Sequence, residues 1–136
     1  MRRRIFLDTS YLLALVRSRD NRHGAAVAAS QVYLGPFLTT DLVLIELANS
    51  MASPPARQTA VVIIERIRTD RLTQVISVTP ALLEEALQLY KQRPDKAWGM
   101  VDCFSFVAMR TKGSTVALTF DDHFRQAGFS VPLLEE

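Results

Sequence analysis

Cysteine is almost missing from this chain. Cys103 is the only one, so no disulfide can form within a single copy. The two histidines, His23 and His123, have no cysteine or second histidine at the spacing of a zinc site. These absences exclude a disulfide-stabilised secreted scaffold and a zinc-binding module. They fit a reducing compartment, so we expect a cytoplasmic protein.

Long hydrophobic runs are missing as well. No apolar stretch is long enough to cross a membrane, so we expect no membrane partner. The start of the chain resembles a secretory signal only weakly, because the polar residues Asp8, Thr9 and Ser10 interrupt its apolar run. The 136 residues contain no repeat or low-complexity tract, and 49% are hydrophobic. We therefore expect one globular domain over residues 1–136.

Net charge is small, at +2, and indicates no particular partner. Its composition is more informative, because 13 of the 16 basic residues are arginine, whose planar guanidinium suits phosphate. If four of the 14 acids gather in one pocket, ten acids remain against 16 basic residues elsewhere. A basic rim around an acidic pocket suits a polyanion. Arginines that merely solvate the surface are the alternative interpretation.

Short apolar strands alternate with helical segments along the chain. Strands are expected at residues 3–7, 37–39, 74–78 and 115–119, with a last fragment at 129–131. Helices are expected at residues 11–16, 20–33, 42–49, 54–67, 82–90 and 101–110, with a short one after Asp121. This alternation predicts the α/β class, with a mostly parallel central sheet and helices on both faces.

Acidic residues occupy unusual positions in this pattern. Asp8 and Asp121 each follow an apolar strand, and functional groups of parallel sheets gather at such carboxyl ends. Glu46 and Asp102 are lone acids in apolar helical stretches. Each of the four, taken alone, has an ordinary alternative as a helix cap, a turn residue or a solvent-facing side chain. No matching set of basic residues is available to neutralise them together, which favours a divalent cation.

The ligand type narrows the choice of metal. Carboxylate oxygens without cysteine or paired histidine suit Mg²⁺ or Mn²⁺ rather than zinc. Ions of this kind activate water and stabilise a leaving oxygen, which is the chemistry of phosphodiester hydrolysis. A metal-dependent nuclease is the function that this pattern favours.

Four segments in order resemble one family, the PIN-domain nucleases, and in particular the VapC-type toxins of bacterial toxin–antitoxin systems. They are Phe6-Leu7-Asp8-Thr9-Ser10, Glu46, Trp98-Gly99-Met100-Val101-Asp102-Cys103 and Thr119-Phe120-Asp121-Asp122-His123-Phe124. The resemblance covers nearly the whole chain. It implies a PIN-like fold and an endoribonuclease whose metal-binding, catalytic acids are Asp8, Glu46, Asp102 and Asp121.

The resemblance also implies accessory residues and partners. Thr9 or Thr119 would hydrogen-bond a carboxylate or a metal-bound water, Asp122 would be an accessory or helix-start residue, and Asp95 is a weaker accessory candidate. The implied partners are an RNA substrate, a cognate antitoxin and a second copy of the chain in a homodimer. A toxin and a general RNA-processing enzyme are not distinguished.

Three neighbouring residues receive structural interpretations. We expect His123 to be a packed or capping residue, Cys103 an inert buried thiol and Trp98 a core residue. Two other functions remain open. One is a non-catalytic PIN scaffold that binds RNA or protein, and the other is a Mg²⁺-binding receiver-type signalling domain.

Overall fold

A parallel four-stranded sheet forms the centre of the computed structural model, which describes residues 3–135. Its strands are β1 (Ile5–Leu7), β2 (Phe37–Thr40), β3 (Thr73–Ile76) and β4 (Val116–Leu118), in the spatial order β3-β2-β1-β4. Every neighbouring pair is parallel. The expected α/β class is confirmed. The carboxyl ends of all four strands therefore share one edge of the sheet.

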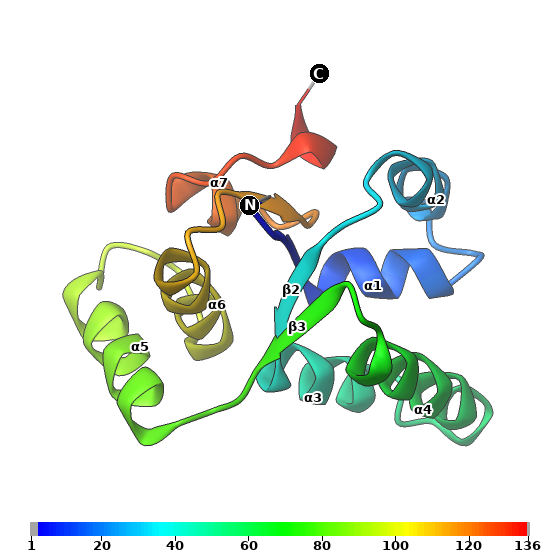
Figure 1. Ribbon diagram of the computed structural model, residues 1–136, viewed down its shortest axis with the longest axis horizontal. Coiled ribbons are helices and arrows are strands. Elements are labelled where there is room, and N and C mark those ends of the chain that lie inside the picture. Colours follow the sequence, from blue (N-terminus) through cyan, green and yellow to red (C-terminus); the bar gives the residue numbers. More distant parts are fainter. Residues whose placement is uncertain (1–2, 136) are drawn as a thin grey trace.

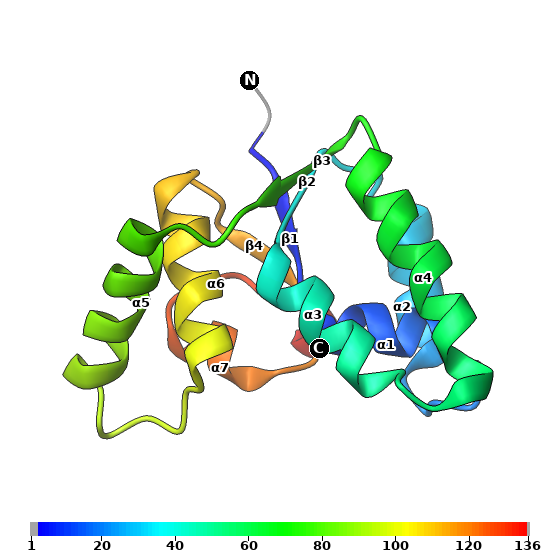
Figure 2. The same ribbon diagram turned by 90° about the horizontal axis from the view of Figure 1, so that it is seen from below.

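Helices cover both faces of this sheet (Figures 1 and 2). On one side lie α5 (Pro80–Gln92) and α6 (Met100–Thr111). On the other lie α1 (Thr9–Val16), α2 (His23–Val32) and α4 (Pro54–Thr69). The helix α3 (Asp41–Ser50) starts where β2 ends and contacts both α1 and α6. No helix within residues 3–135 combines the length and apolar character needed to cross a membrane.

Threonine caps fix two of the helix starts that the sequence indicates. The Thr40 hydroxyl accepts a 3.2 Å hydrogen bond from the backbone N–H of Val43 at the start of α3. Thr79 does the same for Leu82 at the start of α5, where Pro80 occupies the first helical position. A hydroxyl that accepts from an otherwise unpaired backbone N–H stabilises the first turn of a helix. These caps set where each helix leaves the sheet.

Two expectations differ from the structure by more than a shift of one or two residues at an element's end. The segment 129–131 is no strand, because it forms only an isolated parallel bridge between Ser130 and Val116 and then enters a 3₁₀ turn at Pro132. The helix expected from residue 20 begins at His23, because Asp20 instead closes a turn, with its carboxylate accepting the Arg22 N–H at 2.7 Å. In both places local hydrogen bonding overrides the apolar pattern.

An aromatic cluster in the core anchors the last helix, α7 (Asp122–Gln126). Phe124 of α7 is fully buried and meets the Phe106 ring edge-on at 5.0 Å between centroids. Trp98 packs edge-on against Phe106 at 5.1 Å and is 5% exposed, as expected for a core residue. Cys103 is buried, as expected, and burial raises the pKa of its thiol. That the thiol is inert stays a prediction.

Candidate metal-binding site

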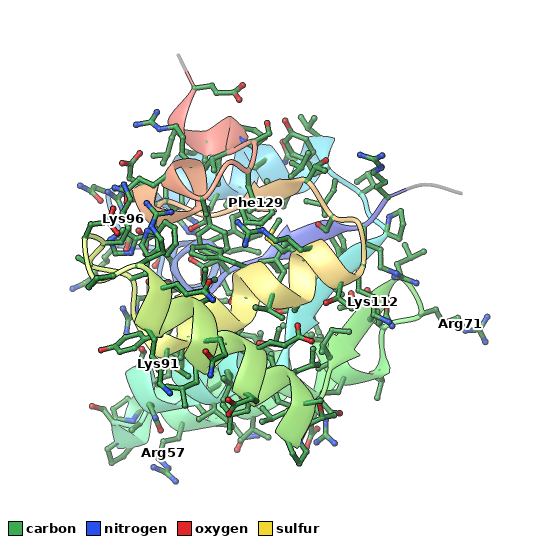
Figure 3. All side chains as sticks on the ribbon, turned by 90° about the vertical axis from the view of Figure 1, so that its left-hand side faces the viewer. Arg57, Arg71, Lys91, Lys96, Lys112 and Phe129 are labelled. Carbon is green, nitrogen blue, oxygen red and sulfur yellow. The ribbon has the colours of Figure 1, made fainter. Side chains whose placement is uncertain are left out.

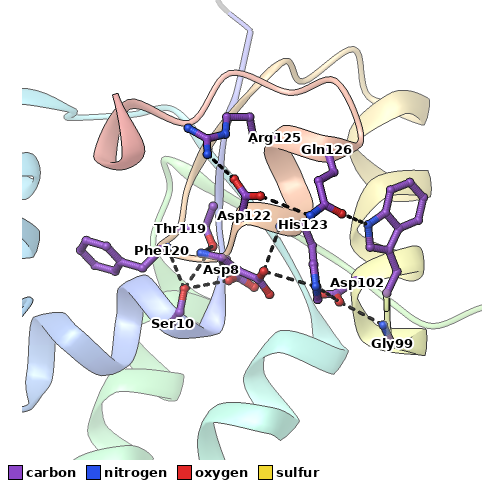
Figure 4. A network of polar contacts seen from close by, with 12 residues as sticks. Asp8, Ser10, Gly99, Asp102, Thr119, Phe120, Asp122, His123, Arg125 and Gln126 are labelled. Atoms are coloured by element: carbon purple, nitrogen blue, oxygen red, sulfur yellow. Dashed lines mark hydrogen bonds and ion pairs between the residues drawn. The ribbon is translucent and has the colours of Figure 1, made fainter. Parts of the chain in front are cut away.

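Asp8 is a buried carboxylate that two hydroxyl groups hold in place (Figure 4). It follows β1 directly and is 6% exposed. Its Oδ2 atom accepts hydrogen bonds from Thr119 Oγ1 at 2.7 Å and from Ser10 Oγ at 3.0 Å. Each hydroxyl carries a single proton, and both protons are directed to Asp8. The backbone N–H of Asp8 also donates a 3.1 Å hydrogen bond to the backbone carbonyl of Leu118 in the adjacent β4.

The protonation of Asp8 reflects this burial. Loss of hydration raises the pKa of the carboxyl from 3.8 to about 6, against the opposing effect of hydrogen bonds from Thr119, Ser10 and the Thr9 backbone. The negative charge of Asp102 raises it further. Asp8 and Asp102 therefore interact electrostatically. A nearby cation would remove much of the cost of ionising Asp8.

Asp102, Asp121 and His123 form a cluster beside Asp8. One ligand atom from each lies within 4.8 Å of the other two. His123 Nδ1 lies 2.9 Å from Asp102 Oδ2 and 3.3 Å from Asp121 Oδ1. Asp102 comes from the first turn of α6, and Asp121 comes from the loop between β4 and α7. Three elements distant in sequence thus supply the cluster and its neighbour Asp8.

Both clustered acids also cap helices, as their alternative interpretation proposed. Asp121 Oδ1 accepts the His123 N–H at 2.9 Å, and Asp102 Oδ2 accepts the Gly99 N–H at 3.0 Å. Each cap uses one carboxylate oxygen. Within residues 3–135, Asp102 Oδ1 and Asp121 Oδ2 accept no hydrogen bond. Capping therefore leaves one oxygen of each acid available to a cation.

Glu46 is less tightly placed than the other three acids. It is half-buried on α3, a helix that contacts both α1 and α6. Asp8 precedes α1 directly, and Asp102 lies in the first turn of α6. Its carboxylate makes no ion pair within the described part of the chain. Its assignment as a metal ligand stays a prediction.

The accessory residues separate into two groups. Thr119 holds Asp8, whereas the Thr9 hydroxyl donates to the Val43 carbonyl at 3.5 Å and so joins α1 to α3. Asp122 is paired with Arg125 at 2.6 Å, as a helix-start residue would be. Asp95 is exposed and forms an ion pair with Arg93 at 3.0 Å, which lowers the pKa of Asp95. Neither Asp122 nor Asp95 belongs to the described cluster.

Residues 5–130 match the PIN domain family. The chain belongs to this family. The match covers the sheet, the acidic cluster and every helix from α1 to α7. Membership of the PIN domain family excludes the receiver-type signalling domain that the sequence had left open.

Known proteins resemble this PIN domain over most of its length. It is 33% identical over 125 residues to the 23S rRNA-specific endonuclease VapC20 of Mycobacterium tuberculosis, which covers 92% of this chain and 95% of that protein. The crystal structure of VapC20, described as a Sarcin-Ricin loop cleaving toxin, superposes with a TM-score of 0.85. FitAcB from Neisseria gonorrhoeae shares the fold at 18% identity, with a TM-score of 0.68 over 93% of this chain and 95% of that one.

Two residues of this PIN domain were not expected at the site. His123 contacts both clustered acids although the sequence favoured a packed or capping role, and Ser10 donates to Asp8. The spacing carries a weak signal in both cases. Each lies two residues after an acid at a helix N-terminus, so its side chain turns back toward that acid in the first turn. Only the tertiary fold brings Asp102 to the Nδ1 atom of His123, which also contacts Asp121.

The donor set of this PIN domain fits Mg²⁺ or Mn²⁺. Carboxylate oxygens dominate it, and both ions prefer oxygen ligands. The imidazole of His123 is the one nitrogen donor in the described cluster. Asp102 and Asp121 would hold the ion, with the carboxylate of Asp8 adding charge beside them.

Proposed function

We propose that this PIN domain is a metal-dependent endoribonuclease and the toxin of a toxin–antitoxin pair. The observation that carries the proposal is the convergence of Asp8, Asp102 and Asp121 at one edge of the sheet, with oxygens left for a cation. The relative VapC20, named as a 23S rRNA-specific endonuclease, supports RNA as the substrate. By resemblance we add Glu46 to the metal-binding, catalytic acids.

The protein residues have distinct parts in the proposed reaction. The acids would hold a divalent cation, which when bound would supply Lewis-acid chemistry at the phosphate and activate water. The hydroxyl groups of Thr119 and Ser10 keep Asp8 oriented. Asp8 lies close enough to Asp102 for the two carboxylates to interact electrostatically. The backbone N–H groups of Gly99 and His123 each bond one oxygen of a remaining acid, which restricts the rotation of that carboxylate.

RNA cleavage by purified protein tests this function. Total RNA and intact ribosomes are incubated with protein and Mg²⁺ or Mn²⁺, and new 5′ ends are mapped. Because the relative VapC20 is named for 23S rRNA, that molecule is the first substrate to examine. We expect metal-dependent cuts that EDTA, Asp8→Asn and Asp102→Asn each abolish. Equal cutting by wild type and both variants would contradict the proposal.

A non-catalytic scaffold is the second function to be tested. It predicts RNA binding that persists in Asp8→Asn and Asp102→Asn, with no cleavage by any form under any metal condition. A scaffold would have no use for three converging acids, because like charges at close range destabilise the fold. We therefore favour the enzyme.

An apolar groove supports the proposed antitoxin partner. It runs between α1, α2 and α4, has a volume of about 610 Å³, and is lined by residues that include Leu12, Leu15, Tyr33 and Ile63. Leu34 at its margin is 68% exposed. Apolar surface of this kind on a small protein commonly binds another protein. We propose that an apolar segment of the antitoxin lies here.

Co-expression with the product of an adjacent reading frame that encodes a small DNA-binding protein tests this assignment. Leu34→Asp should abolish co-purification while RNA cleavage by the isolated protein is retained. Co-purification at the wild-type level would place the antitoxin elsewhere. The implied homodimer is a separate proposal, which light scattering of the purified protein tests directly.

A further inference from the structure

Arginine side chains lie over aromatic rings at three places in residues 3–135. The pairs, with the distance from guanidinium carbon to ring centroid, are Arg22 over Phe120 at 5.0 Å, Arg93 over Trp98 at 5.1 Å and Arg110 over Phe129 at 5.7 Å. A cation over a ring face is held in position by the quadrupole of the ring. All three guanidinium groups are therefore partly ordered.

The three differ in what else the guanidinium contacts. Arg93 forms two hydrogen bonds with Asp95, both at 3.0 Å, and Arg110 donates to the Ala127 carbonyl at 3.3 Å. Arg22 has no such acceptor in the part of the chain that the structure describes. The nearby Asp20 carboxylate accepts the backbone N–H of Arg22 at 2.7 Å and makes no ion pair with its side chain. Arg22 is thus a positioned cation whose donors stay open.

Phe120 places this cation beside the acidic cluster. It stands between Thr119, which holds Asp8, and the clustered Asp121, and its own N–H donates to Ser10 Oγ at 2.9 Å. The ring is 9% exposed and points away from the acids, along α1 (Figure 4). Arg22, which lies over this ring, is therefore adjacent to the acidic cluster but is not part of it.

We propose that Arg22 binds a backbone phosphate of the RNA adjacent to the phosphate that is cut. The proposal rests on the proposed function. A guanidinium carries a permanent charge and a planar set of donors that matches two phosphate oxygens. Stacking on Phe120 holds the side chain in place before RNA arrives, which lowers the entropy lost on binding. The direction of the Phe120 ring assigns Arg22 to a flanking phosphate.

RNA binding without divalent metal gives the first test. Fluorescently labelled RNA is titrated with protein in EDTA, where no cleavage occurs, over a range of salt concentrations. Arg22→Gln should weaken binding about fivefold and reduce the salt slope by about 0.7, the loss of one phosphate contact on a single strand. Arg22→Lys should recover part of the affinity. Unchanged affinity in Arg22→Gln would overturn the proposal.

Arg71→Gln is the matched control. It removes the same charge from an exposed side chain just before β3, at the opposite edge of the sheet from the acids (Figure 3). We expect wild-type RNA affinity. A loss equal to that of Arg22→Gln would show that net charge alone governs binding, which would also overturn the proposal.

Substitution of Phe120 provides an independent test of the proposal. Phe120→Leu keeps an apolar side chain but removes the stacking face, so it should weaken RNA binding when Arg22 is present and add nothing in Arg22→Gln. Full additivity of the two changes would contradict the stacked arrangement. In steady-state cleavage with metal, Arg22→Gln should raise KM and leave kcat near the wild-type value. A fall in kcat alone would contradict a binding role.

The two proposals fail in different ways. RNA binding in EDTA contains no cleavage step. If Arg22→Gln weakens binding while wild type cuts no RNA, the proposed function fails and the phosphate contact is retained. If wild type cuts RNA and Arg22→Gln binds normally, the contact fails and the enzyme is retained.

Discussion

Thr119 Oγ1 lies 2.7 Å from Asp8 Oδ2, although 111 residues separate the two along the chain. The same oxygen accepts the backbone N–H of Asp121 at 3.0 Å. One threonine side chain therefore aligns two acids that follow neighbouring strands. The alignment depends on the register of β1 against β4, which pairs Leu7 with Leu118.

Thr119→Val should weaken both folding and cleavage. The substitution keeps the shape of the side chain but removes the donor to Asp8 and the acceptor for the Asp121 N–H. Leaving buried polar groups unpaired costs about 1–3 kcal/mol of unfolding free energy. Denaturant unfolding and RNA cleavage with Mn²⁺ measure the two effects. Thr9→Val is the control, because the Thr9 hydroxyl contacts Val43 and no acid. Equal loss of cleavage in both variants would contradict the role of Thr119.

Asp8 should make the metal-free protein less stable as pH rises. Its pKa is about 6 in the folded chain against an ordinary value of 3.8, so between these pH values the folded state binds more protons than the unfolded state. The unfolding free energy then falls with rising pH, by about 3 kcal/mol in total from this group, and the loss is complete above the folded pKa. Asp8→Asn should remove this decline.

Urea unfolding in EDTA, between about pH 4 and pH 7, measures the decline. Asp95→Asn is the matched control. The ion pair with Arg93 lowers the pKa of Asp95, so Asp95 stabilises the fold at higher pH, and its removal should leave the fall caused by Asp8 in place. Persistence of the full decline in Asp8→Asn would show that another group causes it.

Divalent metal should stabilise wild type more than the acid variants. A ligand that binds only the folded state adds about 2.7 kcal/mol at a concentration of one hundred times its Kd. Thermal melts with Mn²⁺ and with EDTA measure this shift in wild type, Asp102→Asn and Glu46→Gln. We expect both substitutions to reduce it. A wild-type shift in Glu46→Gln would remove Glu46 from the ligand set, and the same result in Asp102→Asn would contradict the site.

His123→Ala should weaken Mn²⁺ binding. The imidazole contacts Asp102 and Asp121, and loss of a group that orients metal ligands typically costs about 10–100-fold in affinity. Isothermal titration with Mn²⁺ measures the change. Asp122→Asn is the neighbouring control, since Asp122 is directed to Arg125 and Gln126. Wild-type affinity in His123→Ala would assign the residue a structural role only.

Strand ends were the most informative feature of the sequence. Asp8 and Asp121 could be expected to meet because parallel strands share one carboxyl edge, and β1 and β4 are indeed neighbours. Which threonine holds Asp8 could not be predicted. Thr9 and Thr119 both lie next to strand ends, and only the path of the chain after β1 turns Thr9 toward α3.

Contacts that depend on tertiary packing could not be predicted from the sequence. His123 reaches Asp102 because Phe124 anchors α7 against Phe106, and no local pattern encodes that distance. The segment near Ser130 has the apolar character of a strand but forms one bridge only, because Pro132 lacks the N–H that would continue the ladder. Local propensity and long-range geometry disagree at these two places.

The order of the strands along the chain also governs the order in which the acidic cluster can assemble during synthesis. Asp8 is translated 111 residues before its partner Thr119, and the clustered Asp121 also follows β4. A nascent chain that lacks residues 116–121 has neither the hydroxyl that orients Asp8 nor one of the clustered acids. If the chain is a ribonuclease toxin, the ribosome that makes it is therefore exposed to no active enzyme until β4 and the acids after it have been translated.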